Sequence, residues 1–504
     1  MTSSSNPGGA LRRLALNVLQ PGFVGTEAPG WVLRAVADGL SSVVLFARNI
    51  DSPDQVARLT ERLRAENPAL IVAIDEEAGD VTRIESAAGS SRPGNFALGT
   101  VDDPELTEAV AADLGRQLRA AGVSLDYAPS ADVNSNPDNP VIGVRSFGTG
   151  TDVVSRHTAA WVRGLQSAGV AACAKHFPGH GDVAVDSHHD LPAYLAGREE
   201  IEARALPPFR AAVDAGARAV MSGHLLVPAY DPGRPATLSR RILHDLLRGE
   251  LGFDGLVVSD AIEMAAVTRA YGIGGAAVRA VAAGVDALCV GGESAEESTT
   301  ELLAGALAGA VTDGALAEER LADAARRVAE FADWSVKLRE SAGDAPGGGA
   351  GIGQLAARRA VRVTGAVRDA LPLPSAPHVV ELAPATNLAI GKETPWGIAA
   401  ALRERLPDTT SVRVHGHQLQ ARTVALEECA LRPAVGRPLV VVVRDAARHG
   451  WMSRAVTDLT TARPDAVLVE MGLPHPLTEG AVQVFTHGAS TASGVAAAEV
   501  LTGG

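Results

Sequence analysis

Residues 153–182, VVSRHTAAWVRGLQSAGVAACAKHFPGHGD, contain the unit whose repetition decides the fold. The stretch Val153–Ala168 has apolar residues at helical spacing, and the apolar run Ala171–Ala174 is typical of a buried strand. A loop rich in histidine and glycine follows this run directly. This order predicts a helix, then a strand of a parallel sheet, then a polar loop at the carboxyl end of that strand.

The same alternation fills the first two thirds of the 504-residue chain. The apolar runs expected to be strands are Ala15–Leu19, Val43–Phe46, Ala69–Ile74, Leu125–Ala128, Ala171–Ala174, Ala219–Met221, Leu256–Val258 and Ala287–Val290. The helical segments between them include Pro53–Arg64, Glu105–Ala121, Val153–Ala168, Ile201–Ala215 and Arg240–Leu251. Eight such strands predict an α/β fold of the (β/α)8 TIM-barrel type. A doubly wound sheet is the alternative, but no glycine-rich fingerprint follows the first run.

A second domain is expected after a break in composition. The long helical stretch Leu316–Leu338 is followed by SAGDAPGGGAGIG at 341–353, which is typical of a linker. Beyond it, the runs HVVELA, SVRVHG, PLVVVVRD, AVLVEMG and AVQVFTHG alternate with helical segments. We therefore expect a barrel over 1–340, a linker over 341–356, and a smaller α/β sandwich domain with an open parallel sheet over 357–504.

Composition excludes several classes of protein. With 46% hydrophobic residues the chain has ample material for cores, and a net charge of −14 argues against nucleic acid or an anionic membrane as a partner. The three cysteines are odd in number and far apart, which suits reduced thiols in the cytoplasm. The amino-terminal stretch is a poor signal peptide, and no apolar run reaches 18 residues. A cytoplasmic enzyme is the expectation.

The polar residues that follow the expected strands are candidates for the chemistry, because a barrel enzyme holds its reacting groups at the carboxyl ends of its strands. These residues are Asp75, Arg83, Asp132, Arg145, Lys175, His176, His180, His188, His189, His224 and Asp260.

The loop 175–190 is the most informative of these strand ends. Asp186 and His188 are separated by one residue, so on a loop the carboxylate and the imidazole can meet. Such a pair fixes the tautomer of the ring and favours its protonated form, which suits a general acid or base near neutral pH. A metal-binding or purely structural histidine cluster is the alternative.

Asp260 lies at the end of the buried run in GLVVSDAIEM. Taken alone, it or Ser259 could be a helix N-cap, and Asp75 could form a buried ion pair with Arg83. Two carboxylates together with an Asp–His pair suit glycoside cleavage, in which one carboxylate attacks the anomeric carbon and an acid protonates the leaving oxygen.

Four segments carry a resemblance to a known family: DYAPSADVNSNPDNPVIGVRSFG, AKHFPGHGDVAVDSH, PATLS and VVSDAIEM. They resemble family-3 glycoside hydrolases, in particular bacterial β-N-acetylglucosaminidases. The resemblance extends from about residue 14 to about residue 335. The second domain is similar, more weakly, to the C-terminal α/β sandwich of two-domain members.

The resemblance implies a role for individual residues. Asp260 matches the nucleophile that forms a glycosyl-enzyme intermediate, with retention of configuration. His188 matches the general acid/base, and Asp186 matches its partner. The residues that match substrate-binding positions are Asp75, Arg83, Arg145, Lys175, His176 and Met264. Neither a cofactor nor a metal is implied, and the expected partner is a small carbohydrate, an N-acetylglucosaminide.

One stretch departs from the family pattern. The usual string after the third strand is D-x-E-G-G-R-V, whereas this chain has Asp75-Glu76-Glu77-Ala78-Gly79-Asp80-Val81. An alanine thus replaces a glycine and an acidic residue replaces a basic one, which changes the local electrostatics and puts the aglycone preference in doubt.

Three other functions stay open. Phosphate could replace water as the acceptor, which would make the enzyme a phosphorylase. A metal-dependent barrel hydrolase would use strand-end residues such as His224, but the His-x-His expected on the first strand is absent. A non-catalytic sugar-binding protein is the third alternative.

Overall fold

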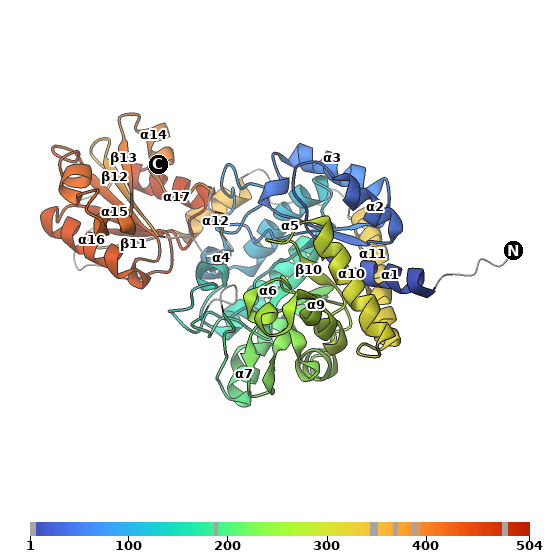
Figure 1. Cartoon of the computed structure of the whole chain (residues 1–504). Helices are drawn as coiled ribbons and strands as arrows, with labels where there is room; N and C mark the ends of the chain where they lie inside the picture. The colour runs from blue at the N-terminus through green and yellow to red at the C-terminus, as the bar shows by residue number, and fades with distance from the viewer. Residues whose placement is uncertain are drawn as a thin grey trace. The chain divides into compact units, whose positions relative to one another are not determined.

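The computed structural model describes residues 7–185, 190–342, 351–365, 371–384, 390–391, 394–475 and 482–504 (Figure 1). The chain divides into two compact units. The barrel unit comprises Met1–Glu76, Thr107–Ile142 and Gly148–Gly349. The sandwich unit comprises Glu77–Leu106, Gly143–Phe147 and Ala350–Gly504. None of the helices in the described ranges is long and apolar enough to cross a lipid bilayer.

Eight parallel strands form the barrel, as predicted. They are β1 (Leu19–Pro21), β2 (Ser42–Leu45), β3 (Ile71–Ile74), β4 (Leu125–Asp126), β5 (Ala171–Phe177), β6 (Ala219–Ser222), β9 (Leu256–Ser259) and β10 (Leu288–Val290). A six-stranded sheet runs in the order β2-β3-β4-β5-β6-β9, and β10 pairs with β1. Backbone hydrogen bonds between Ser259 and Ala287 (3.0 Å) and between Ala287 and Val257 (3.1 Å) continue the sheet from β9 to β10. Between β1 and β2, Gln20 Nε2 donates to Ser42 Oγ at 2.8 Å, so side chains join these two strands.

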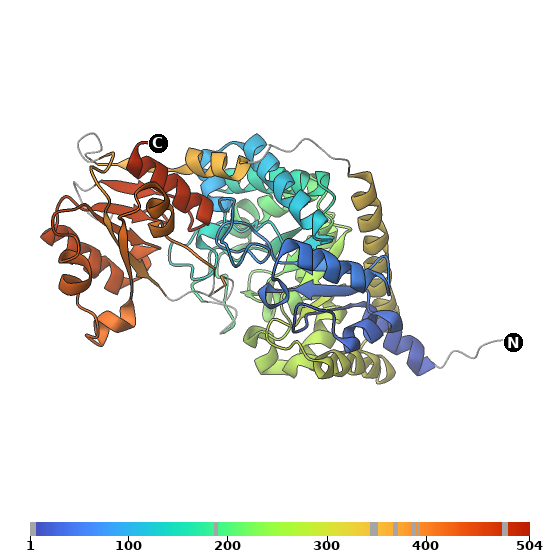
Figure 2. The same cartoon turned by 90° about the horizontal axis from the view of Figure 1, so that it is seen from above.

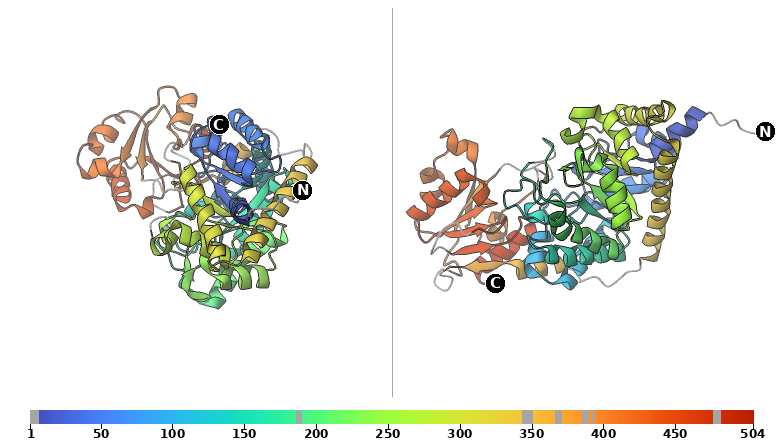
Figure 3. Two further views of the ribbon diagram at one scale, coloured as in Figure 1. Left: turned by 45° about the vertical axis from the view of Figure 1, so that its right-hand side comes forward. Right: turned by 90° about the horizontal axis from the view of Figure 1, so that it is seen from below.

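The helices of the barrel unit surround these strands (Figures 2 and 3). They are α1 (Pro7–Asn17), α2 (Gly30–Asp38), α3 (Pro53–Arg64), α5 (Pro104–Ala120, whose first residues belong to the sandwich unit), α6 (Thr151–Ser167), α7 (Arg198–Arg204), α8 (Leu206–Asp214), the π-helix η4 (Arg241–Glu250), α9 (Ala265–Ala283), α10 (Glu297–Thr312) and α11 (Glu318–Ser341). Short 3-10 turns lie at η1 (Ala47–Asn49) and η3 (Ala236–Leu238), and β7 (Leu226–Val227) pairs antiparallel with β8 (Asp231–Pro235).

Local sequence explains where these helices begin. At α3, the Ser52 hydroxyl accepts the backbone N–H of Gln55 at 3.2 Å, and Pro53 occupies the first helical position. Serine is a favoured N-cap, and proline at that position removes an N–H that would have no helical partner. The predicted bounds of this helix are confirmed.

Two predictions along the barrel differ from the structure. The run Ala15–Leu19, expected to be a strand, ends helix α1, and β1 begins only at Leu19. The helix expected over Ile201–Ala215 is part of two helices, α7 and α8, which meet at Ala205 ahead of two prolines. Proline lacks the N–H that would continue the first helix, which accounts for the break.

Alternate strand residues fill the interior of the barrel, because successive side chains of a strand point to opposite faces. Members of this buried core include Ile71, Ala73, Leu125, Ala171, Cys173, Ala219, Met221, Leu256 and Val258. Val328, Phe331 and Ala332 of α11 belong to the same core.

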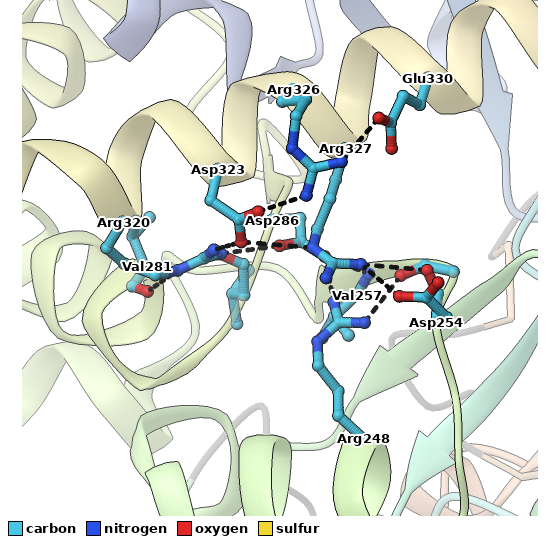
Figure 4. A network of polar contacts seen from close by, with 12 residues as sticks. Arg248, Asp254, Val257, Val281, Asp286, Arg320, Asp323, Arg326, Arg327 and Glu330 are labelled. Atoms are coloured by element: carbon cyan, nitrogen blue, oxygen red, sulfur yellow. Dashed lines mark hydrogen bonds and ion pairs between the residues drawn. The ribbon is translucent and has the colours of Figure 1, made fainter.

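A cluster of ion pairs lies at the amino ends of the barrel strands (Figure 4). Asp286, which is fully buried just before β10, accepts from Arg248 at 2.6 Å, from Arg320 at 2.7 Å and from the Val257 N–H at 3.0 Å. Burial raises the pKa of Asp286, and the two guanidinium groups oppose that rise. At the margin of the cluster, Arg327 donates to Asp254 at 3.0 Å.

The sandwich unit contains a six-stranded sheet in the order β11-β16-β15-β14-β12-β13. Its strands are β11 (Arg362–Thr364), β12 (His378–Ala383), β13 (Thr410–His415), β14 (Leu439–Val443), β15 (Val467–Glu470) and β16 (Gln483–Phe485). All five predicted runs are strands and pair in parallel, whereas β11 was not predicted and pairs antiparallel with β16.

Helices cover both faces of this sheet (Figure 1). Buried residues of α16 (Gly450–Ala462) pack with Val441 and Val443, and residues of α14 (Ala399–Arg405) and α17 (Thr491–Thr502) pack with Val440 and Val442. The alternating valines of β14 thus serve two cores, one on each face. Further helices beyond residue 350 in the described ranges are α12 (Ile352–Ala360), α15 (Gly416–Gln420) and the short η5 (Glu427–Leu431) and η6 (Ala446–Arg448).

Two segments from the first third of the chain belong to the sandwich unit. Residues 77–106, which include α4 (Asn95–Val101), and residues 143–147, which include η2 (Gly143–Arg145), pack with residues beyond 350. The Ala492 N–H donates to Ser90 O at 3.2 Å, and the Thr491 hydroxyl donates to Ala88 O at 2.8 Å. Residues 77–106 are therefore hydrogen-bonded to the C-terminal part of the chain.

Candidate active site

Asp75 comes directly after β3, and the ammonium group of Lys175 on β5 donates to its Oδ1. The Lys175 side chain is buried, while that of Asp75 is 24% exposed. Asp126 lies on β4, the strand that pairs with β3. It is fully buried and accepts the Glu76 N–H at 3.0 Å. Burial raises the pKa of Asp126 well above its usual range, with the charge of Glu76 adding to the rise. The neutral form of Asp126 is thereby favoured, and Asp75 has an ammonium partner in Lys175.

Asp132 follows β4 and is fully buried, and its carboxylate contacts two histidines. Its Oδ2 lies 2.7 Å from Nδ1 of His176, and its Oδ1 accepts the His180 N–H at 2.7 Å. Burial alone would raise the pKa of Asp132, but the facing histidines lower it overall. An ionised Asp132 holds the proton of His176 on Nδ1 and fixes the tautomer of the ring.

Sequence reasoning did not assign Asp132 a role. The signal that could have found it is the position of a carboxylate in the string PSADVN, one strand before Lys175-His176. Carboxyl ends of neighbouring parallel strands meet at one edge of a sheet, so the sequence order places the carboxylate and the imidazole at the same edge, while their contact depends on strand register.

Asp260 comes directly after β9 and is partly exposed. Its Oδ1 accepts the Ala261 N–H at 2.7 Å, and its own N–H donates to Ser222 O at 3.1 Å. Helix α9 begins only at Ala265, with Met264 in the N-cap position. The interpretation of Asp260 as a helix N-cap is therefore wrong, and so is that of Ser259, whose hydroxyl accepts from Cys289 N at 3.1 Å.

His224 supports the turn that carries Asp260. Its Nδ1 lies 2.8 Å from the Thr237 hydroxyl, and its Nε2 lies 3.0 Å from Ala261 O. The ring joins the PATLS segment to the residue after Asp260 and is fully buried. This geometry gives His224 a structural contact at each nitrogen. Met264, also buried, follows on the same turn.

Arg83 and Arg145 lie in the segments that belong to the sandwich unit. Arg83 is 7% exposed. Arg145 donates Nε and Nη2 to the two carboxylate oxygens of Glu77 at 2.9 and 2.7 Å, and its carbonyl accepts from Asn95 at 2.7 Å. A bidentate pair of this kind fixes the plane of the guanidinium group as well as its position.

The expected acid/base pair, Asp186 and His188, lies outside the described residues, as does His189. In the barrel unit the described candidates are Asp75, Lys175, His176, Met264 and Asp260, which all occur at or just beyond the carboxyl ends of β3, β5 and β9. These strand ends provide carboxylates, an ammonium group and an imidazole of fixed tautomer, a set suited to binding hydroxyls and to nucleophilic attack by a carboxylate. Within the described ranges no group of three or more His, Cys, Asp or Glu side chains is placed to hold a metal ion.

Comparison with protein-family models gives one match to the chain. Residues 33–331 match the glycosyl hydrolase family 3 N-terminal domain.

Curated relatives match about half of the chain. A beta-hexosaminidase of Stenotrophomonas maltophilia is 40% identical over 263 residues, which are 50% of this chain and 76% of that protein. Beta-hexosaminidase A of Pseudoalteromonas piscicida is 36% identical over 268 residues, 49% of this chain. That match spans only 45% of the length of the Pseudoalteromonas protein.

A solved structure matches both units. The glycoside hydrolase family 3 beta-N-acetylglucosaminidase from Paenibacillus is 31% identical, with a TM-score of 0.84 over 98% of this chain and 96% of that one. The similarity to this structure therefore includes the sandwich unit, whereas each curated relative cited above matches about half of the chain.

Proposed function

Because the chain belongs to glycosyl hydrolase family 3, we propose that it is an exo-acting β-N-acetylglucosaminidase that removes terminal N-acetylglucosamine with retention of configuration. The observation that carries the proposal is the place of Asp260. Its carboxylate follows β9 without capping a helix, is partly exposed, and is oriented by the Ala261 N–H. A carboxylate held in this way at a barrel strand end is suited to attack on an anomeric carbon.

In the first step, Asp260 forms a bond to the anomeric carbon while the bond to the leaving oxygen breaks. His188 gives its proton to that oxygen, and Asp186 stabilises the imidazolium before the transfer. In the second step, the neutral imidazole takes a proton from water, whose oxygen attacks the anomeric carbon and releases Asp260. Two inversions at one carbon give net retention. The roles of His188 and Asp186 rest on the sequence resemblance.

A histidine acid suits the charges of this unit. Asp75 and Asp260 both bring negative charge to the strand ends, and a carboxylic acid beside them would lose its proton less readily, as like charges raise each other's pKa values. An imidazolium instead becomes neutral when it gives up its proton. The second step then begins without an additional negative charge.

Sugar binding falls to the remaining candidates. We propose that Asp75 accepts hydrogen bonds from sugar hydroxyls while Lys175 holds its carboxylate in place through Oδ1. His176 would donate from Nε2, since Asp132 holds the other nitrogen. Arg83 and Arg145 would supply further donors, and Met264 would pack against the nucleophile.

The proposed substrates are cell-wall fragments or chitin-type oligosaccharides with a terminal N-acetylglucosamine, and the proposed location is the cytoplasm. The names beta-hexosaminidase and beta-N-acetylglucosaminidase of the relatives support the sugar class. The cysteine usage of the sequence supports the compartment.

One assay tests the proposal. The purified chain is given an aryl β-N-acetylglucosaminide, with and without added phosphate, and NMR records the anomer that appears first. We expect hydrolysis without phosphate and β-N-acetylglucosamine as the first product. The matching aryl β-glucoside is the control and should be a poor substrate. An α-anomer as the first product, or no turnover of the N-acetylglucosaminide, would contradict the proposal.

A further inference from the structure

Asp80 forms a buried ion pair with Arg444 inside the sandwich unit. The two side chains are 3% and 6% exposed. One carboxylate oxygen accepts from Arg444, which directly follows β14, and the other accepts the Ala489 N–H at 2.7 Å. A single carboxylate is thereby fastened to residues beyond two strands of the sheet, β14 and β16.

The turn that carries Asp80 has little freedom of its own. Ala78 and Gly79 both have left-handed backbones, with φ of 59° and 61°, and the Glu77 N–H donates to Val81 O at 3.0 Å. A Cβ added to Gly79 would lie 2.4 Å from the Cα of Gly94. The turn thus packs against the neighbouring backbone, and an alanine in the left-handed region costs conformational energy that other contacts must offset.

Two of the proposed sugar-binding side chains depend on this turn. Glu77 at its start holds the guanidinium group of Arg145 through two hydrogen bonds. Arg83 follows Asp80 by three residues. A shift of the turn would therefore move both arginines, one through its carboxylate partner and the other through the backbone.

We propose that Asp80 and Arg444 are positioning residues for substrate binding: the pair locks the turn 77–83, and the sandwich unit thereby sets the positions of Arg83 and Arg145. The proposal rests on the proposed function for the part that concerns the sugar. It gives the sandwich unit a role in substrate affinity through residues that touch no substrate themselves.

Removal of one partner is the sharpest perturbation, because it leaves a buried charge without its counter-charge. In Arg444→Met the Asp80 carboxylate keeps only the Ala489 N–H among the contacts described above, and the turn is expected to move toward water. Arg444→Lys keeps a cation and is the conservative variant. Arg413→Met is the matched control, since Arg413 pairs with the buried Glu381 of the same sheet at 2.7 Å.

Steady-state kinetics on the aryl β-N-acetylglucosaminide provides the first readout. We expect Arg444→Met to raise KM at least tenfold and to change kcat less than threefold, while Arg444→Lys stays within threefold of the wild type in KM. Arg413→Met should leave both constants unchanged. A purely structural pair would lower Tm without moving KM, so a wild-type KM in folded Arg444→Met overturns the proposal.

The double variant Asp80→Asn/Arg444→Met guards against failure to fold, because it leaves no unpaired buried charge. It should fold and still show a raised KM, since the ion pair is gone. A KM equal to that of the wild type in the double variant overturns the proposal as well.

Hydrogen exchange gives a readout that needs no turnover. Amides of residues 77–91 should exchange faster in Arg444→Met than in the wild type and in Arg413→Met. Equal rates would overturn the proposal. If the wild type itself cleaves no N-acetylglucosaminide, the proposed function fails, and the exchange data still decide whether the pair locks the turn.

Discussion

The two ends of the barrel strands use carboxylates in opposite ways. At the amino ends, Asp286 is fully buried and held by two arginines and a backbone N–H (Figure 4). At the carboxyl ends, Asp75 and Asp260 are partly exposed, and Asp132 is buried against the ring of His176. Arginine stays charged at any physiological pH, whereas histidine gains and loses its proton near neutrality.

The difference predicts that carboxylates at the amino ends contribute to stability and those at the carboxyl ends to the proposed reaction. A fully buried carboxylate held by permanent cations is closed to a ligand and contributes to stability. Carboxylates with partial exposure keep room for a reacting partner. Substitutions at the two ends should therefore affect different measurements.

The largest expected effect is that of Asp260→Asn at the carboxyl end. Loss of the proposed nucleophile should lower kcat/KM by roughly 10³-fold or more, about 4 kcal/mol of transition-state stabilisation. Because Asp260 is partly exposed, Tm should change little. Activity is measured on the aryl β-N-acetylglucosaminide, and Tm by calorimetry. Wild-type activity in this variant would remove Asp260 from the mechanism and break the comparison.

Asp286→Ala at the amino end should have the reverse signature. It leaves two guanidinium groups without their buried counter-charge and the Val257 N–H without an acceptor, which should cost about 3–5 kcal/mol of unfolding free energy. Denaturant unfolding measures this loss. The kcat/KM of the folded fraction should stay within twofold of the wild type; a large loss of activity at full folding would show that the two ends are not independent.

The pH dependence of the unfolding free energy tests the role of a histidine at the carboxyl ends. Burial lowers the pKa of His180 from 6.5 to about 4. The unfolded chain then binds a proton between these values that the folded chain does not, so stability is complete above pH 6.5 and falls as the pH drops toward 4, by about 3 kcal/mol at most. His180→Gln removes this term.

The quantity to measure is the change in unfolding free energy between pH 7 and pH 5. It should be smaller in His180→Gln than in the wild type. An unchanged slope in His180→Gln would mean that His180 is protonated in the fold.

The smallest effect is expected for Asp254→Ala, the matched control for Asp286→Ala. Asp254 belongs to the same cluster, yet its side chain is 92% exposed where it pairs with Arg327. An exposed ion pair contributes only about 0–1 kcal/mol. Denaturant unfolding should therefore show little change. A loss as large as that of Asp286→Ala would assign the stability to the number of ion pairs and not to the buried carboxylate.

Much of this arrangement could be predicted from the sequence, because the alternation of apolar runs and helical segments sets the order of strands in both units. Placing Asp75, Lys175, His176 and Asp260 at the carboxyl ends of strands followed from that order. The error at Ala15–Leu19 arose because a short apolar run fits a helix and a strand equally well.

Contacts between residues far apart in the sequence could not be predicted from hydrophobic periodicity. Nothing in the string Ala78-Gly79-Asp80 indicates that its carboxylate meets an arginine far along the chain. The antiparallel strand β11 is three residues long and partly or fully exposed, so it lacks the apolar run that marks the other strands. The Asp132 contacts with His176 and His180 likewise depend on strand register, which the sequence pattern leaves open.

The pairing of Asp80 with Arg444 also has a consequence in time. The two residues are separated by 364 positions, so on a ribosome adding about 5–20 residues per second Asp80 emerges roughly 20–70 s before its partner is made. During that interval residues 77–106 lack the part of the sandwich unit against which they pack. This segment therefore makes its final contacts only when the last third of the polypeptide has been synthesised.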